Sequence, residues 1–230
     1  MMEFFAANEV SILRWLHIIA MVYWLGGEWG VFQTSYNIIN QKLSLDERRR
    51  HMETAYRIDI LARTGIIMLL PLGLHMGHIY GLQPLGGEWL TGMWIGIAAW
   101  LTLTWSAFFA RETNLGIFLT KVDEAIRYLV IPALILVGIS SLVQAWPLDT
   151  PEGSKWYAAK VTLYGGLLVI GLLLRYIMRG WTEMFRVLAG GPNAEVEAEL
   201  NRQIRFGRGL AYVYWIGIAT TAFFGAVKPF

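Results

Sequence analysis

The sequence predicts an all-α fold: a polytopic bundle of about six transmembrane helices that forms one membrane domain over residues 1–230. Hydrophobic residues make up 56% of the chain and charged residues only 16%, whereas about 25% of an ordinary soluble domain is charged. The chain also contains 11 Trp, 11 Phe and 10 Tyr. Many of these rings lie near the ends of apolar runs, where aromatic side chains anchor helices at the membrane surface. We therefore expect an integral membrane protein surrounded by a lipid bilayer.

A membrane-spanning helix needs about 20 mostly apolar residues. Taken in chain order, six stretches meet this requirement, and the first is longer than the apolar region of a signal peptide, so we expect it to remain in the mature protein. The predicted spans are 12–38, 58–83, 92–112, 127–146, 156–179 and 206–227. The connections near 41–51, 84–88, 112–124, 147–155 and 180–201 contain the Pro, Gly and charged residues expected of surface turns.

The basic residues are distributed unevenly between the two ends of the predicted bundle. Fourteen of the 19 Lys and Arg residues lie in or beside the connections that join spans one to two, three to four and five to six. Basic residues accumulate on the cytoplasmic side of a membrane. Both termini are therefore predicted on the outer face, and the expected location is a bacterial inner membrane.

Several function classes are excluded by what the chain lacks. It contains no Cys, which excludes disulfides, thiolate metal sites and iron–sulfur clusters. The small net charge of +2 does not indicate a nucleic-acid partner. There is no Gly-rich phosphate loop, no nucleophile elbow and no HExxH motif. A bound metal would therefore depend on His, Met, carboxylate or a cofactor of its own.

Four ionisable side chains are expected at one depth in the outer half of the bilayer. His17 lies roughly 8 Å into the first span, and His75 and His78 lie roughly 12 and 8 Å below the outer end of the second. Lys160 enters the fifth span from the same side. Because ionisable groups at membrane depth face a bundle interior or a cavity and mark functional sites, we treat these residues as candidate cofactor-binding residues.

Two interpretations of the three histidines remain open. Each could form interhelical hydrogen bonds, or the three could be ligands, since imidazole binds heme iron and copper. His75 and His78 are three residues apart and so share a helix face. They could hold one small metal ion together with His17, or one could bind a heme iron while the other contacts a propionate, a second heme or a substrate.

A charged pair is predicted deeper in the bundle. Glu28 lies about 24 Å along the first helix from Ile12, and Arg63 lies at a comparable depth in the second. A Glu28–Arg63 ion pair would satisfy both charges, either as a structural pair or as part of a proton path. The glycines beside Glu28 favour close helix packing.

Several short motifs lie in the first helix and in the second half of the chain. Those of the first helix are Trp15-Leu16-His17-Ile18-Ile19 and Trp24-Leu25-Gly26-Gly27, and the later ones are Arg127-Tyr128-Leu129-Val130-Ile131-Pro132-Ala133, Trp156, Lys160-Val161-Thr162-Leu163, Arg205-Phe206 and Lys228-Pro229-Phe230. The first helix resembles the HemJ and CopD-like membrane families. The order of the later motifs is similar to that of HemJ, the heme-containing protoporphyrinogen oxidase family, with two helices inserted. The resemblance implies that His17 is a heme ligand and that Lys160 and Arg205 or Arg208 are basic partners of carboxylates.

The preferred hypothesis from the sequence is a heme b redox protein. His17 and either His75 or His78 would ligate the iron, and Lys160 or the third histidine would meet a propionate. Electrons would pass to or from a quinone, a porphyrinogen or a periplasmic carrier, or the protein would be a protoporphyrinogen oxidase-like oxidoreductase. The alternatives are a CopD-like copper protein with a three-imidazole site, and an accessory subunit of a respiratory or photosynthetic complex. Association into a homo-oligomer also remains open.

Overall fold

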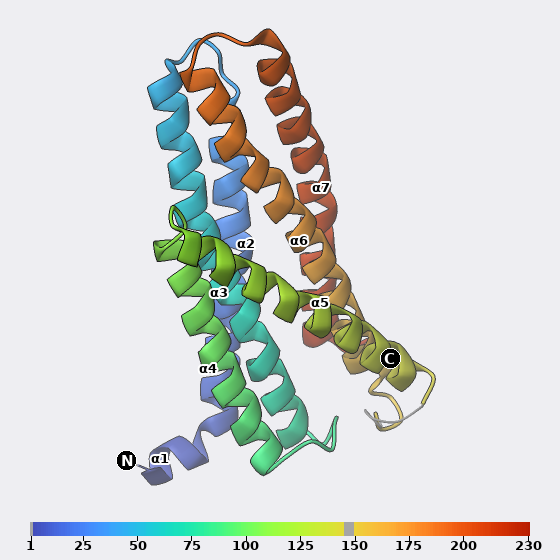
Figure 1. Cartoon of the computed structure of the whole chain (residues 1–230). Helices are drawn as coiled ribbons and strands as arrows, with labels where there is room; N and C mark the ends of the chain where they lie inside the picture. Colours follow the sequence, from blue (N-terminus) through green and yellow to red (C-terminus); the bar gives the residue numbers. More distant parts are fainter. Residues whose placement is uncertain (1, 145–149) are drawn as a thin grey trace.

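The computed structural model describes residues 2–144 and 150–230, and the described part of the chain is helical with no β-strand (Figure 1). Six of its helices are long and apolar enough to cross a membrane, which confirms the predicted fold class. The elements are the short α1 (Met2–Ala7) followed by α2 (Glu9–Ile38), α3 (Leu45–Ile79), α4 (Glu88–Phe109), α5 (Asn114–Leu142), α6 (Lys155–Ala189) and α7 (Ala194–Val227). Both termini lie at one end of the bundle, here called the terminal end, and the α2–α3 and α6–α7 turns lie at the opposite, hairpin end (Figure 1).

Each of the six long helices begins before its predicted span, and the largest differences are at the starts of α3 and α5. Ser44 and Glu47 form a capping box: the Ser44 hydroxyl accepts from the Glu47 N–H at 3.3 Å, and the Glu47 carboxylate accepts from the Ser44 N–H at 2.9 Å. This cap satisfies backbone donors at the helix start, so much of the predicted turn at 41–51 is helical. The predicted turns at 112–124 and 180–201 are also largely helical. Residues 145–149, with the end of the fourth predicted span, lie outside the described part.

The extra helical turns contribute to a second core at the hairpin end. With 34 or 35 residues each, α3, α6 and α7 are about 50 Å long, whereas the hydrocarbon core of a bilayer is about 30 Å thick. The excess extends at the hairpin end, where α2, α3, α6 and α7 share buried apolar side chains. These are Val31, Ile38, Met52, Ala55, Met178, Trp181, Met184, Phe185, Leu188, Leu200 and Ile204.

One buried arginine joins the two hairpins at this end. Arg48 of α3 is only 4% exposed. Its Nε donates to the carbonyl of Ile38 at 2.7 Å, and its two terminal nitrogens donate to the Glu197 carboxylate of α7 at 2.6 and 2.7 Å. A bidentate arginine–carboxylate pair fixes both distance and direction. It therefore sets how the α2–α3 hairpin sits against α7.

Small residues bring α2 and α3 together inside the membrane. A Cβ added to Gly27 would lie 2.8 Å from the Cβ of Ala62, and one added to Gly65 would collide with the carbonyl oxygen of Ala20. Close approach of two backbones at small residues is a principal source of helix association in lipid. Gly27 thus serves packing, as the sequence suggested.

We predict that Arg48→Ala lowers the free energy of unfolding by about 3 to 5 kcal/mol, because Glu197 loses its partner in a buried pair. Arg202→Ala is the matched control, since Arg202 pairs with Glu199 on the surface and is 77% exposed. That change should cost at most about 1 kcal/mol. Denaturant unfolding in detergent measures both values, and equal losses would contradict the role assigned to Arg48.

Candidate functional site

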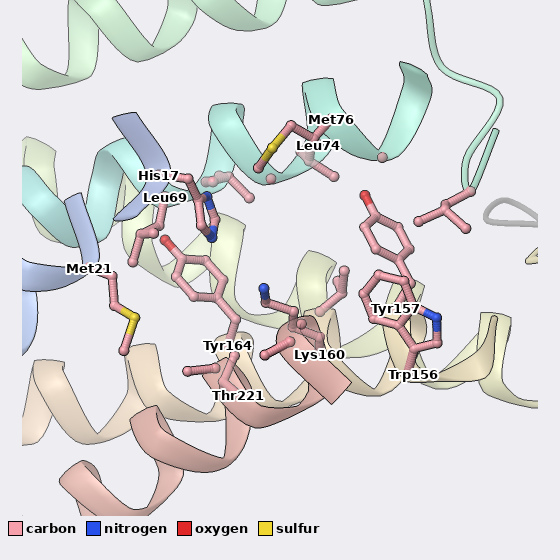
Figure 2. A pocket seen from close by; sticks show the side chains of 18 of the residues that line it. His17, Met21, Leu69, Leu74, Met76, Trp156, Tyr157, Lys160, Tyr164 and Thr221 are labelled. Carbon is pink, nitrogen blue, oxygen red and sulfur yellow. The ribbon is translucent and has the colours of Figure 1, made fainter. Parts of the chain in front are cut away.

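A cavity of about 590 Å³ lies between the helices in the terminal half of the bundle (Figure 2). Side chains from α2, α3, α5, α6 and α7 line this large pocket, and most of them are apolar. Its volume is in the usual range for small-molecule and cofactor sites, roughly 300 to 1,000 Å³. The polar or charged side chains among its lining residues are Arg14, His17, Trp24, Tyr80, Trp156, Tyr157, Lys160, Tyr164, Thr221 and Lys228.

Three aromatic residues separate the large pocket from the inner part of the bundle. Trp24 of α2 donates through Nε1 to the Tyr214 hydroxyl of α7 at 3.0 Å, and the Tyr164 hydroxyl of α6 donates to the carbonyl of Ile66 in α3 at 2.5 Å. The Trp24 ring meets both tyrosine rings edge to face. Its centroid lies 6.1 Å from that of Tyr164 and 5.6 Å from that of Tyr214. We call Trp24, Tyr164 and Tyr214 the aromatic floor. It links α2, α3, α6 and α7.

His17 and Lys160 meet in the large pocket, as their predicted depth suggested. Figure 2 shows the His17 imidazole and the Lys160 ammonium directed into the same space. The Nδ1 atom of His17 is buried and has no hydrogen-bonding partner in the protein. Gly73 lies beside this ring, and a Cβ added there would make an ordinary contact with the His17 Cε1 at 3.5 Å. The pocket thus holds one imidazole with unused bonding capacity.

Three cations border the large pocket, and no carboxylate does. Arg14, Lys160 and Lys228 all line it, whereas none of its lining residues is Asp or Glu. Within the described residues, none of the three forms an ion pair. Arg14 donates to the Tyr80 hydroxyl at 2.8 Å, and the Lys228 ammonium lies 5.5 Å from the centre of the same ring. Arg14 and Lys228 are exposed at the edge of the pocket, whereas Lys160 is half-buried, so the cost of an unpaired charge away from water applies to Lys160 and favours an anionic ligand beside it.

Lys228 reaches the pocket through an unusual backbone conformation. It caps the C-terminus of α7 with φ of 53°, in the left-handed region that residues other than glycine seldom adopt. The chain then turns back, and the carbonyl of Phe230 accepts from the Trp156 N–H at 3.0 Å. Lys228 lies 5.4 Å from the Trp156 ring centre as a result. The turn therefore places a cation at the edge of the pocket.

Sequence reasoning missed Arg14 and Lys228 as pocket residues. Arg14 belongs to none of the motifs noted in the sequence, and Lys228 was noted only within Lys228-Pro229-Phe230. A signal for Arg14 was present, since Arg14, His17 and Met21 are three and four residues apart and therefore share one helix face. The conformation of Lys228 depends on the contacts of the chain beyond α7, and no pattern in the sequence indicated it.

His75 and His78 do not line the large pocket, which corrects the predicted ligand set. Gly73 and Gly77 line it, and His75 is two residues from each, hence about 200° around α3 from both. The Nδ1 atom of His75 accepts from Trp94 Nε1 at 3.3 Å, so its Nε2 carries the hydrogen that faces Glu9 at 3.4 Å. These two contacts tie α3 to α4 and to the start of α2.

His78 packs against the α3–α4 connection, where a Cβ on Gly86 would collide with its ring. Among residues 2–144 and 150–230, no three His, Asp or Glu side chains gather closely enough to share a metal ion. The predicted three-imidazole site of His17, His75 and His78 is therefore not formed. The depth of these residues was predicted from helix rise, but the direction in which each points depends on helix rotation.

The arginines that the family resemblance suggested as carboxylate partners lie away from the large pocket. Arg208 donates through Nε to the Ser35 hydroxyl at 2.9 Å and stacks over Tyr36, and Arg205 is exposed. Both belong to the part of α7 nearer the hairpin end. Neither lines the pocket that contains His17.

A second, small cavity of about 20 Å³ lies beyond the aromatic floor. Its polar lining comes from five helices: Glu28 of α2, Asp59 and Arg63 of α3, Arg127 of α5, Arg175 of α6 and Tyr214 of α7. Arg63 forms its ion pair with Asp59, one turn earlier in α3, rather than with Glu28 as predicted. An i,i+4 pair needs no particular helix packing, so Arg63 finds its counter-charge within its own helix. Glu28 lines the same cavity without forming this ion pair.

Asp123 holds the arginines of this cavity and is fully buried. Its carboxylate accepts from Trp100 Nε1 at 2.7 Å and from the Thr104 hydroxyl at 3.1 Å, both on α4. It also pairs with Arg127 of its own helix and with Arg175 of α6. Sequence reasoning placed Asp123 in a surface connection, although its spacing of four residues from Arg127 was a visible signal.

Comparisons with models of known protein families, with curated proteins and with solved structures found no match. The function of the large pocket is therefore argued from its residues.

We predict that Asp123→Asn destabilises the protein by about 3 to 5 kcal/mol, because it leaves Arg127 and Arg175 buried with their shared counter-charge removed. Glu183→Gln, on an exposed carboxylate whose side chain is 66% accessible, should change the stability by less than about 1 kcal/mol. Thermal unfolding in detergent distinguishes the two. If both variants unfold at the same temperature, Asp123 does not neutralise Arg127 and Arg175.

Proposed function

We propose that this protein is a membrane redox protein that binds a b-type heme in the large pocket, with His17 as an axial ligand. The observation that carries the proposal is the combination of an apolar cavity of about 590 Å³, one imidazole and three cations without a carboxylate. Heme b has a flat apolar ring, an iron that accepts imidazole, and two propionates. The resemblance of the first helix and of the later motifs to the HemJ family supports the same assignment.

The chain's own residues fit such a group in two respects. His17 has a buried nitrogen without a partner, and imidazole is a common axial ligand of heme iron. Arg14, Lys160 and Lys228 would bind the propionates, because charge-assisted hydrogen bonds to carboxylates are the stronger ones. When bound, heme would supply one-electron redox chemistry. The surrounding apolar side chains would exclude water from it.

The second axial position would not be filled by His75 or His78. Two thioethers, those of Met21 and Met76, line the large pocket instead, and a His/Met ligand pair raises the reduction potential of a heme. The three-imidazole site of the copper alternative has no such support, because no group of three His, Asp or Glu side chains that could hold a metal ion occurs in the described residues. A heme in this position would exchange electrons with a quinone, a porphyrinogen or a periplasmic carrier.

The proposed setting is a bacterial inner membrane with both termini on the periplasmic face. The distribution of basic residues supports this orientation. The large pocket would then lie in the outer half of the bilayer, and the hairpin end would extend into the cytoplasm.

Purified protein expressed with ample heme should show a b-type spectrum in the dithionite-reduced minus oxidised difference and in the pyridine hemochrome assay. His17→Ala should abolish or strongly shift this spectrum, because it removes the imidazole of the pocket. His75→Ala and His78→Ala are the matched controls and should leave it unchanged. A protein without a Soret band, or a spectrum insensitive to His17→Ala, would refute the heme proposal, and stoichiometric copper without porphyrin would replace it.

Lys160→Ala and Lys228→Ala should each weaken heme binding by about 10- to 100-fold, because a hydrogen bond to a charged group contributes roughly 1.5 to 3 kcal/mol. Lys155→Ala is the control, since Lys155 is exposed at the same end and does not line the pocket. Titration of heme into the apoprotein, followed by absorbance, measures the dissociation constants. Unchanged affinity in both variants would remove the propionate role from these lysines.

A further inference from the structure

The small cavity has the size and the chemistry of a site for bound water. A cavity needs roughly 10 to 15 Å³ and two to four polar partners to hold one water molecule, and this one measures about 20 Å³. Arg127 lines it with a buried terminal nitrogen that has no partner in the protein. The Tyr214 hydroxyl also lines it and accepts from Trp24, so its own hydrogen remains available. Glu28 supplies the third polar group.

The charges around the cavity leave Glu28 as the one acid without a direct partner. Arg63 pairs with Asp59, while Arg127 and Arg175 share Asp123. Within the described part of the chain, Glu28 forms neither an ion pair nor a hydrogen bond. The charged or titratable groups that line the cavity with it are Asp59 and Arg63 of α3, Arg127 of α5, Arg175 of α6 and Tyr214 of α7.

Two opposing effects act on the Glu28 carboxyl. Placing an unpaired carboxylate at membrane depth is costly, which favours the neutral acid. The arginines that line the cavity favour the carboxylate, although Asp59, Asp123 and Glu124 offset much of their positive charge. Because burial and the nearby arginines act in opposite directions on Glu28, gain or loss of one proton can interconvert its carboxylate and its neutral acid.

A run of charged side chains joins this region to the surface. Glu124 lies 3.9 Å from Arg175 and also pairs with Arg179, whose side chain is 52% exposed. Glu28 itself lies about 28 Å along α2 from Glu9, close to the full thickness of the hydrocarbon core. The cavity therefore lies toward the hairpin end of the bundle, and the aromatic floor separates it from the large pocket.

We propose that the small cavity is a proton-binding site in which water joins Glu28 to Arg127 and Tyr214. A proton from the hairpin-side solvent adds to the Glu28 carboxylate to give the neutral acid, and the same proton returns when the carboxyl ionises. The charge of the cluster rises by one on uptake, with no other bond broken. The site does not depend on which ligand the large pocket binds.

Infrared difference spectroscopy of the purified protein across a pH titration tests the proposal. The C=O stretching band of a protonated carboxyl should disappear with rising pH, shift in D₂O and be absent in Glu28→Gln. The matched control Glu183→Gln alters an exposed carboxylate and should retain the band. His17→Ala should retain it too, which distinguishes this site from heme binding. If no band depends on Glu28, the carboxyl is a permanent counter-ion and the proposal is wrong.

Tyr214→Phe provides the second test, should Glu28→Gln fail to fold. It removes the hydroxyl hydrogen that faces the cavity and keeps the ring of the aromatic floor. Loss of a hydrogen bond to the carboxyl or to its water should raise the C=O frequency and move the midpoint of the titration. An unshifted band with an unchanged midpoint would overturn the assignment of Tyr214, Glu28 and the water to one site.

Discussion

The aromatic floor is the interaction on which the arrangement of both cavities depends. In lipid, helices gain little by hiding apolar surface from one another, so packing and interhelical hydrogen bonds hold them together. Trp24 joins α2 to α7 through Tyr214, and Tyr164 joins α6 to α3. These two bonds lie at the level where the large pocket ends and the small cavity begins. If the four helices separated there, both cavities would lose their common wall.

The two sides of this floor differ in how charge is balanced. The small cavity contains arginines that Asp59 and Asp123 neutralise within the protein. The large pocket contains Arg14, Lys160 and Lys228 without any acid. Of these three cations only Lys160 is half-buried, while Arg14 and Lys228 are exposed at the edge of the pocket. Lys160 is therefore the cation whose missing partner supports the proposal of an anionic ligand.

The sequence predicted how deep each candidate residue lies in the bundle, but not the direction in which its side chain points. Length, hydropathy and helix rise placed His17 and Lys160 in one layer, and the structure brings them into one pocket. The same reasoning placed His75 and His78 in that layer, but they face α4 and the α3–α4 connection. Rotation about a helix axis is set by contacts such as that of Gly65 with α2, and these depend on the partner helix. The extension of α3 at the hairpin end was readable from the capping box at Ser44. The spacing of Asp123 from Arg127 indicated a pair within α5, but its burial depends on Trp100 of α4 and Arg175 of α6.

The large pocket is shared between α2 and α7, the first and the last of the long helices. His17 and the wall that carries Thr221 and Lys228 are therefore brought together across most of the sequence. The α2–α3 pair alone does not enclose the pocket, because α6 and α7 supply its opposite wall. Any ligand of this pocket would therefore be enclosed only after α7 has packed beside α2.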